Sequence, residues 1–388
     1  MKAEEGGTPN PPPSITTLVA TSVTVDGAML NGIVNPNGFD TNAWFDTTNK
    51  VVTNKVICEM RKVCSFTCSI FLTGLAIAAT IFLLRLRSWP FELFHHFVLH
   101  YFLISGLLVV VCTMVRAKLG AASSVALFLL FGFQLWGTYI GPGWSRHCTA
   151  STTEVSQEGL SSITLITYNI KDDNPHHQTL GSWLASQPAD VVVLQEVPSS
   201  VEEWYREKSI YPYQHQVYDP ALNHQNFPED RATVILSKYP FDSSSNFKPS
   251  EDSRPVTFAR LSIPGIENLW IVAIDAREPM TSALLGQRDM LLLGAARKIG
   301  NLDGPVVVTG DFNATPFTPI FDDFLQLADI PPPKSIIASF PAAIGWFGIP
   351  LDHILVRDVQ VADICALSTI GSDHRPVKST LLLAELIK

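Results

Sequence analysis

Apolar and polar positions divide this 388-residue chain into two contrasting parts. In the first part, residues 63–84 contain no charged side chain and exceed the roughly 20 residues that a helix needs to cross a bilayer. Residues 93–115 and 120–140 repeat the pattern. Three such runs in succession, each followed by basic residues or by Gly and Pro, are not typical of a soluble helical core. We therefore expect three transmembrane helices.

In the second part, from Ile163 onward, short runs rich in Val and Ile alternate with stretches of helical periodicity. We expect strands over 163–169, 190–196, 232–237, 256–263, 269–275, 306–310, 351–356 and 376–383, and helices over 177–187, 199–208, 282–299 and 317–327. A turn that contains Pro and Gly joins the fourth and fifth of these strands and predicts a hairpin. This order indicates an α/β domain of two packed sheets flanked by helices, which we place at residues 161–388.

The remaining segments have other compositions. Residues 1–13 are polar and rich in Pro and Gly, which predicts disorder. Residues 14–48 alternate short β-like runs with turn signals and resemble the opening of a bacterial fibronectin type III-like repeat, although they have room for only about three of its roughly seven strands. Residues 141–160 are small and polar, as in a flexible linker. We expect no cleavable signal peptide, and the first membrane helix would direct insertion.

Basic residues flank the apolar runs unequally. Those on the N-terminal side are Lys50, Lys55, Arg61, Lys62, Arg116 and Lys118, and those on the opposite side are Arg85, Arg87 and Arg146. Because Lys and Arg are enriched in cytoplasmic loops, this bias predicts a cytoplasmic N-terminus and a C-terminal domain on the extracytoplasmic side.

Charge is also divided between the two parts. Residues 151–388 contain 17 Lys and Arg against 29 Asp and Glu, a formal −12, whereas the first 150 residues carry 10 against 7, or +3. An acidic domain does not attract polyanions over long distances, so tight binding of nucleic acid is not favoured.

Six cysteines occur, and their spacing shows neither a disulfide framework nor a zinc motif. Four lie in or beside the apolar runs, Cys148 lies in the linker, and Cys365 stands alone in the C-terminal domain. We therefore expect Cys365 to be a small core residue.

Polar side chains follow or end several of the predicted strands. They are Asn169 in T-Y-N-I, Glu196 in V-V-V-L-Q-E, Asp311 and Asn313 in V-V-V-T-G-D-F-N, Asp352 in L-D-H-I-L-V, and Asp373 with His374 in G-S-D-H-R-P. A hard divalent cation needs oxygen ligands, and phosphate ester hydrolysis also needs a base for water and donors for the developing charge. Taken singly, each residue has a simpler explanation, such as a helix cap at Asp311. Together they predict a metal-dependent phosphoesterase site.

These motifs, in this order, resemble the endonuclease/exonuclease/phosphatase family, which includes pancreatic-type deoxyribonucleases, abasic-site endonucleases, inositol-polyphosphate phosphatases and neutral sphingomyelinases. The resemblance covers roughly residues 160–386. It implies a four-layer αββα sandwich of the deoxyribonuclease-like type, with the site at one end of the sandwich.

The resemblance also implies a role for each residue. Glu196 corresponds to the principal metal carboxylate, Asn169 lies beside it, and Asp373 is the second carboxylate near the cation. An all-oxygen site of this kind indicates Mg²⁺, with Mn²⁺ as the alternative.

The other three positions correspond to the catalytic groups. Asp311 would position or deprotonate the attacking water, and Asn313 would donate hydrogen bonds to the phosphate. His374, oriented by Asp352, would stabilise charge on the scissile phosphate.

Two further residues are assigned to substrate binding, and each of them also has another explanation. Asp275 follows the strand 269–274 where relatives commonly place a histidine, so it is either an extra metal ligand or a sign of lost activity. Arg231 opens a strand that runs toward the site and suits a phosphate, but a surface pairing with Glu229 or Asp230 explains it equally well.

We therefore expect a membrane-anchored, Mg²⁺-dependent hydrolase of a phosphodiester in nucleic acid, a nucleotide or a phospholipid head group. The layout resembles bacterial multi-pass proteins that carry this domain at the C-terminus, which implies the inner membrane. The alternative is a catalytically impaired member that binds a ligand or organises the envelope. The sequence identifies no protein partner.

Overall fold

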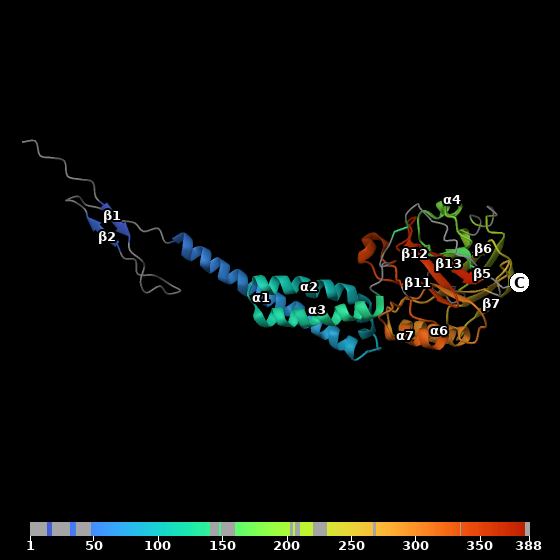
Figure 1. Cartoon of the computed structure of the whole chain (residues 1–388), viewed down its shortest axis with the longest axis horizontal. Coiled ribbons are helices and arrows are strands. Elements are labelled where there is room, and N and C mark those ends of the chain that lie inside the picture. Colours follow the sequence, from blue (N-terminus) through green and yellow to red (C-terminus); the bar gives the residue numbers. More distant parts are fainter. Residues whose placement is uncertain are drawn as a thin grey trace, which may run out of the picture. The chain divides into compact units, whose positions relative to one another are not determined.

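The computed structural model describes residues 14–17, 32–35, 48–139, 147–148, 160–201, 205, 210–219, 231–266, 269–333 and 335–384 (Figure 1). The chain divides into two compact units, Met1–Cys64 and Ser65–Lys388. In the first unit, β1 (Ser14–Thr17) and β2 (Gly32–Asn35) pair antiparallel. The expected disordered segment 1–13 lies outside the described residues, and so do most of the fibronectin-like segment 14–48 and most of the expected linker 141–160.

Three helices are long and apolar enough to cross a membrane, as the uncharged runs predict. The spans are Val56–Leu83 within α1 (Thr48–Leu83), Phe91–Met114, which joins the 3₁₀ helix η1 (Phe91–Phe97) to α2 (Val98–Met114), and Lys118–Trp136 within α3 (Lys118–Tyr139).

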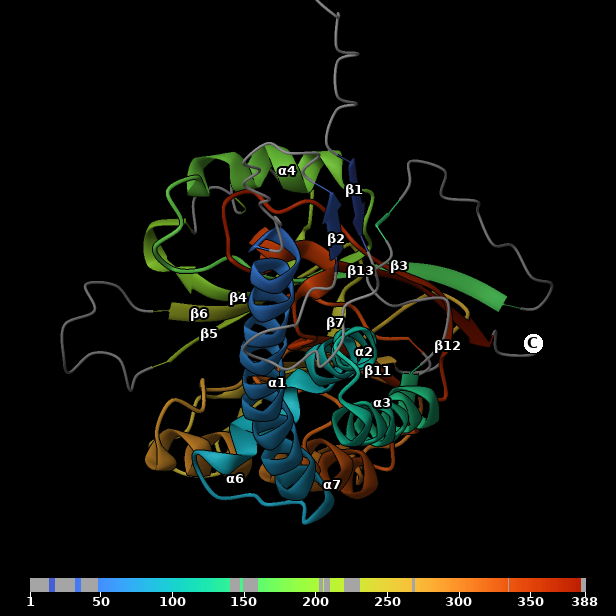
Figure 2. The ribbon, with the colours of Figure 1, turned by 90° about the vertical axis from the view of Figure 1, so that its left-hand side faces the viewer.

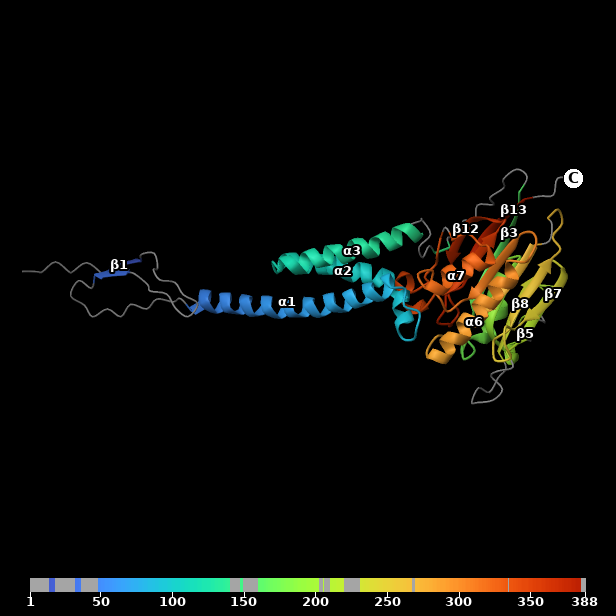
Figure 3. The same cartoon turned by 90° about the horizontal axis from the view of Figure 1, so that it is seen from below.

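Helices α2 and α3 lie side by side (Figures 1 and 3). The rings of Phe102 and Phe128 stack between them with centroids 4.4 Å apart. On the outer surface Leu107, Leu129 and Phe133 are 63–68% exposed. Apolar surface of this extent is costly in water and favourable in hydrocarbon, so the helices are suited to a bilayer.

Two mixed sheets form the C-terminal domain. In spatial order, the six-stranded sheet comprises β12 (Gln360–Ala366), β13 (Val377–Ala384), β3 (Leu160–Asn169), β4 (Val191–Pro198), β6 (Arg231–Ser237) and β5 (Tyr213–Tyr218). The five-stranded sheet comprises β11 (Asp352–Arg357), β10 (Val306–Asp311), β9 (Leu269–Asp275), β8 (Val256–Leu261) and β7 (Phe241–Phe247). The predicted hairpin is the antiparallel pair β8 and β9.

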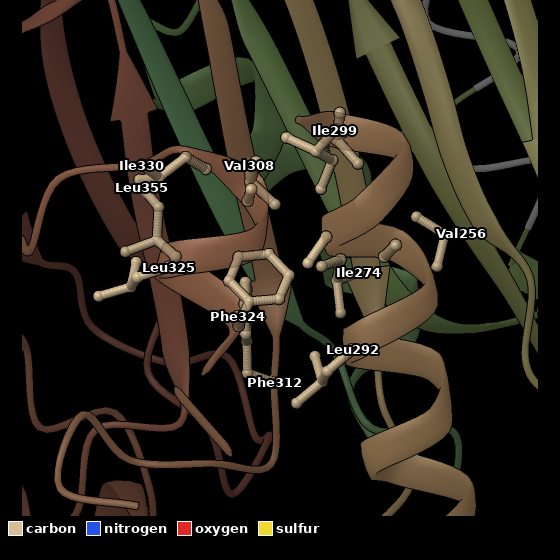
Figure 4. Packing of buried hydrophobic residues seen from close by; sticks show 14 of the residues in the cluster. Val256, Ile274, Leu292, Ile299, Val308, Phe312, Phe324, Leu325, Ile330 and Leu355 are labelled. Atoms are coloured by element: carbon tan, nitrogen blue, oxygen red, sulfur yellow. The ribbon is translucent and has the colours of Figure 1, made fainter. Parts of the chain in front are cut away.

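Helices cover the outer faces of both sheets. Helices α6 (Ser282–Ile299) and α7 (Pro319–Ala328) pack on the five-stranded sheet, where Leu292 and Phe324 meet Ile274 and Val308 (Figure 4). Helix α4 (Leu180–Ser186) covers the six-stranded sheet through Leu180, Trp183 and Leu184, opposite α6 and α7 (Figure 2). Side chains of both sheets fill the middle layer. The fold is therefore the expected four-layer αββα sandwich.

One cysteine pair differs from the expectation. Cys148 and Cys365 form a disulfide with Cα atoms 5.1 Å apart, although their sequence separation is 217 residues. The backbone N–H of Cys148 donates to the carbonyl of Ala366 at 3.0 Å, which lays this short segment beside β12. The expectation that Cys365 is merely a small core residue was wrong, because spacing along the chain does not reveal a partner so far away.

Candidate active site

Three carboxylates meet at one end of the five-stranded sheet. The register pairs Asp311 of β10 with Asp275 of β9 on one side and with Asp352 of β11 on the other. Gly310 precedes Asp311 with φ 130°, and a Cβ there would lie 1.9 Å from the carbonyl oxygen of Ile274. Only glycine fits this close strand pair, so the G-D step fixes where Asp311 leaves the sheet.

A buried histidine links two of these carboxylates. His374 Nδ1 donates to Asp352 Oδ2 at 2.7 Å, and His374 Nε2 lies 3.8 Å from Asp311 Oδ2. Burial disfavours the imidazolium, but the charges of Asp352 and Asp311 outweigh it and raise the pKa of His374 to about 10. Burial, together with the charges of Asp352 and Asp275, raises the pKa of Asp311 well above its ordinary range. His374 is therefore held as an imidazolium, and its Nε2 is directed away from Asp352.

Two asparagines hold the Asp311 carboxylate. Asn169 Nδ2 donates to Asp311 Oδ2 at 3.2 Å, and its own Oδ1 accepts from the backbone of Lys171. Asn313 donates to Asp311 from its backbone N–H at 2.9 Å and from Nδ2 at 3.2 Å, while Nδ2 also donates to the carbonyl of Ala276. Asn313 adopts φ 46°, which is unfavourable for a side chain larger than glycine. The donors of Asn313 are thus directed at Asp311.

Glu196 reaches the site from the other sheet. It lies at an irregularity in the pairing of β4 with β6 and adopts φ 54°. Its Oε1 is 3.5 Å from Arg231 Nη1 and 4.0 Å from Arg254 Nη2. Arg231 also forms an ion pair with Asp172 at 2.5 Å, whereas Glu229 and Asp230, the alternative partners, lie outside the described residues.

These groups surround a cavity of about 860 Å³. Six of the expected site residues line it, namely Asn169, Glu196, Arg231, Asn313, Asp373 and His374. Asp311, Asp352 and Asp275 are buried behind this lining. Carboxylate oxygens of Glu196 and Asp373 and the amide oxygen of Asn169 are hard donors of the type that Mg²⁺ prefers. Among the described residues, Asp311, Asp352 and His374 each place one ligand atom within 4.8 Å of the others, so this end of the sheet offers donors for a metal ion.

Arg254 is a site residue that the sequence reasoning missed. It is buried, forms an ion pair with Asp275, and its Nε lies 3.5 Å from Asp219 Oδ2. Although burial opposes the charge, the carboxylates of Asp275 and Glu196 raise the pKa of Arg254 further above its usual value. The predicted hairpin could have identified Arg254, because residues just before the first strand of a hairpin lie beside the end of its second strand, where Asp275 stands.

Comparisons with known proteins find one matching family and several similar structures. A family model described as the Endonuclease/Exonuclease/phosphatase family matches residues 166–374. No curated protein matches the chain.

Solved structures to which the chain is similar include three bacterial proteins. The endonuclease/exonuclease/phosphatase from Beutenbergia cavernae has a TM-score of 0.47 and 16% identity over 57% of this chain and 72% of its own. The endonuclease/exonuclease/phosphatase from Bacteroides vulgatus has a TM-score of 0.45 and 19% identity over 57% and 99%. Sphingomyelinase C from Streptomyces griseocarneus has a TM-score of 0.42 and 19% identity over 57% and 99%.

The matched segment begins three residues before Asn169 and ends at His374, so it contains every residue that surrounds the cavity from the two sheets. It also covers more than half of the chain. The chain belongs to the endonuclease/exonuclease/phosphatase family.

Proposed function

We propose that this protein is a membrane-anchored, divalent-metal-dependent phosphodiesterase with its catalytic domain at residues 161–388. The observation that carries the proposal is the position of His374, which lies between Asp352 and Asp311 and lines the same cavity as Glu196 and Asp373. A buried imidazolium beside an oxygen-lined cavity donates to a phosphate oxygen that gains charge in the transition state.

Asp311 is assigned to the attacking water. Its raised pKa makes this carboxylate a stronger base than an ordinary aspartate, and Asn169 and Asn313 fix its orientation. Mg²⁺, with Mn²⁺ as the alternative, would be held by Glu196 and Asp373 with Asn169 and would supply Lewis-acid polarisation of a phosphoryl oxygen. The positive charges of Arg254 and Arg231 offset the negative charge of Glu196 and favour an anionic substrate.

Two observations support a domain on the extracytoplasmic side of a bacterial inner membrane. Arg85 and Arg87 form ion pairs with Asp322 and Asp323 of α7, so the loop between the first two apolar helices lies at the same end as the domain. With the basic residues of the other loops in the cytoplasm, this end faces outward. The disulfide between Cys148 and Cys365 is also typical of an oxidising compartment.

Asp275 was the main ground for the alternative, an impaired protein that only binds a ligand or organises the envelope. Its pairing with Arg254 neutralises the extra anion and supports an active site.

The test is hydrolysis by the full chain in lipid nanodiscs of bis-p-nitrophenyl phosphate, DNA, RNA and phospholipid. We expect hydrolysis that requires Mg²⁺ or Mn²⁺ and falls about 1,000-fold or more in Asp311→Asn. Asp303→Asn is the matched control, because Asp303 is exposed before β10. Absence of hydrolysis in a folded protein that still binds Mg²⁺ would favour the binding role, and activity that survives in Asp311→Asn would overturn the assignment of the base.

A further inference from the structure

One wall of the active-site cavity is apolar and includes part of a candidate membrane span. Leu93 and Phe97 of η1 line this wall together with Met280, two residues before α6, and Leu284 in its first turn. Phe97 is 41% exposed and Met280 is 65% exposed. A cavity that hydrolyses phosphate needs no such surface for the reaction itself, so the wall points to a second, apolar part of the substrate.

Buried contacts fix the wall against the catalytic domain. Arg288 of α6 is fully buried and forms an ion pair with Glu92 of η1 at 2.8 Å. The same guanidinium donates to the carbonyl of Asn313 at 3.0 Å. At an exposed position, His100 Nε2 also donates to the carbonyl of Phe347 at 2.8 Å, which joins α2 to a second 3₁₀ helix, η5 (Ala342–Phe347). Because an unpaired buried charge is costly, these contacts hold η1 in a defined position beside the site.

Exposed aromatic side chains also lie around η1 and in the 3₁₀ helix that His100 joins to α2. They are Trp89, Phe91 and Phe94 around the start of η1, and Trp346 and Phe347 in the 3₁₀ helix η5 (Ala342–Phe347). Aromatic residues, Trp above all, are typical of the region where a membrane helix meets the lipid head groups. The surface therefore places the apolar wall at the depth where lipid chains begin.

We propose that the cavity binds a phospholipid of the surrounding bilayer, with its phosphodiester at His374 and Glu196 and its hydrocarbon chain along Leu93, Phe97, Met280 and Leu284. This inference rests on the proposed phosphodiesterase activity and names its substrate class. A nucleic acid has no hydrocarbon chain for this wall, and the acidic domain does not attract a polyanion.

The test varies only the apolar part of the substrate. Methyl, butyl, hexyl and octyl p-nitrophenyl phosphates share one reacting diester and release the same chromophore. With the full chain in nanodiscs, we expect kcat/KM to rise with chain length by up to about fourfold for each methylene that the wall buries. In Met280→Ser/Leu284→Ser, we expect the ratio of octyl to methyl kcat/KM to fall at least about tenfold.

Met290→Ser is the matched control, because Met290 is 49% exposed on α6 but does not line the cavity. Long chains also partition into the nanodisc, but this enrichment is the same for both variants, so only the loss specific to the double variant reports the wall. An equal chain-length dependence in both variants, or a flat dependence in the unmodified protein, would overturn the lipid inference and leave the phosphodiesterase standing. Faster hydrolysis of DNA or RNA than of the octyl diester would overturn it too. Failure on the methyl ester as well would instead count against the proposed function.

Discussion

Arg254 and Asp275 form a buried ion pair beside the Glu196 carboxylate. Burial raises the pKa of Asp275 to about 6, although the guanidinium of Arg254 opposes this rise. The family resemblance leads one to expect a histidine at position 275. Here Asp275 is accompanied by the guanidinium of Arg254, and Arg254 lines the cavity. We therefore expect Arg254 to contact the phosphate and Asp275 to position it.

The pair predicts coupled effects on turnover. Arg254→Gln should lower kcat/KM about 100-fold, because a hydrogen bond between charged groups contributes roughly 1.5–3 kcal/mol. Asp275→Asn should cost less, since Asp219 and Glu196 still face Arg254. In a double-mutant cycle, we expect the combined variant to lose little more than Arg254→Gln alone. Losses that add independently would show that Asp275 does not act through Arg254. Arg260→Gln, a partly exposed arginine of β8, serves as the control.

The contact between Asp352 and His374 predicts a loss of kcat rather than of binding. In Asp352→Asn the side chain keeps its shape, but the carboxylate that fixes the Nδ1 proton is gone. We expect kcat to fall by about 1,000-fold or more, with KM changed less than about threefold, because the imidazolium acts mainly on charge that develops in the transition state. A mainly raised KM, measured by steady-state kinetics with bis-p-nitrophenyl phosphate, would assign His374 to ground-state binding instead.

The burial of His353 predicts that the stability of the protein depends on pH. His353 is buried between Phe312 and Phe321, and Nε2 donates to the carbonyl of Ala314 at 2.9 Å. Burial lowers the pKa of His353 from 6.5 to about 4. As pH falls, the unfolded chain therefore takes up a proton at His353 before the folded protein does. The free energy of unfolding is then unaffected by His353 above pH 6.5 and falls by roughly 3 kcal/mol between about pH 6.5 and pH 4.

Thermal unfolding of the full chain in detergent, measured between pH 4 and pH 7.5, checks this expectation. His353→Gln keeps a donor for Ala314 but does not titrate, so its melting temperature should fall less steeply with acid than that of the unmodified protein. Parallel pH profiles for the two proteins would contradict the assignment to His353.

The sequence predicted the central strands of the C-terminal domain and one edge strand, β11, but missed the other edge strands. The eight expected strands all lie within a few residues of observed ones, because their Val- and Ile-rich runs are buried on both faces. The three strands that were missed, β5, β7 and β12, are all at sheet edges. Strand β7 reads F-D-S-S-S-N-F and is mostly exposed, and polar residues of this kind at an edge resemble a loop in sequence.

The active site shows a similar difference between residues that a local sequence motif identifies and residues that only contacts between distant segments bring in. Asn169, Glu196, Asp311 and His374 carry their chemistry in short motifs at strand ends. The structure brings three of them to the lining of one cavity and buries Asp311 directly behind them. Arg254 has no motif and depends on the pairing of β8 with β9 to reach Asp275. The apolar wall depends on contacts between η1 and α6, which are almost 200 residues apart in sequence, so no local pattern predicts it.

The disulfide predicts a specific pattern of cysteine labelling. Of the six cysteines, Cys58, Cys64, Cys68 and Cys112 are free, whereas Cys148 and Cys365 are joined. Denatured protein isolated without reductant should therefore take up four equivalents of a maleimide, and reduced protein should take up six. Six equivalents without reduction would contradict both the disulfide and the support that it gives to an extracytoplasmic domain.

Arg288 links the apolar helices to the active site. Arg288 bridges Glu92 of η1 and the carbonyl of Asn313, so the residue that holds Asp311 is itself held from the membrane side. Glu92→Gln should leave Arg288 buried with only Asp289 as a carboxylate partner and destabilise the protein by roughly 3 kcal/mol.

The same change should lower kcat for the methyl diester, which does not use the apolar wall, because displacement of Arg288 releases the Asn313 backbone. Glu59→Gln is the matched control, since Glu59 pairs with Lys62 on an exposed helix surface and such pairs contribute little. Melting temperature and kcat should therefore fall together in Glu92→Gln and stay unchanged in Glu59→Gln. A fall in melting temperature with unchanged kcat would show that the ion pair anchors the helices without supporting the site.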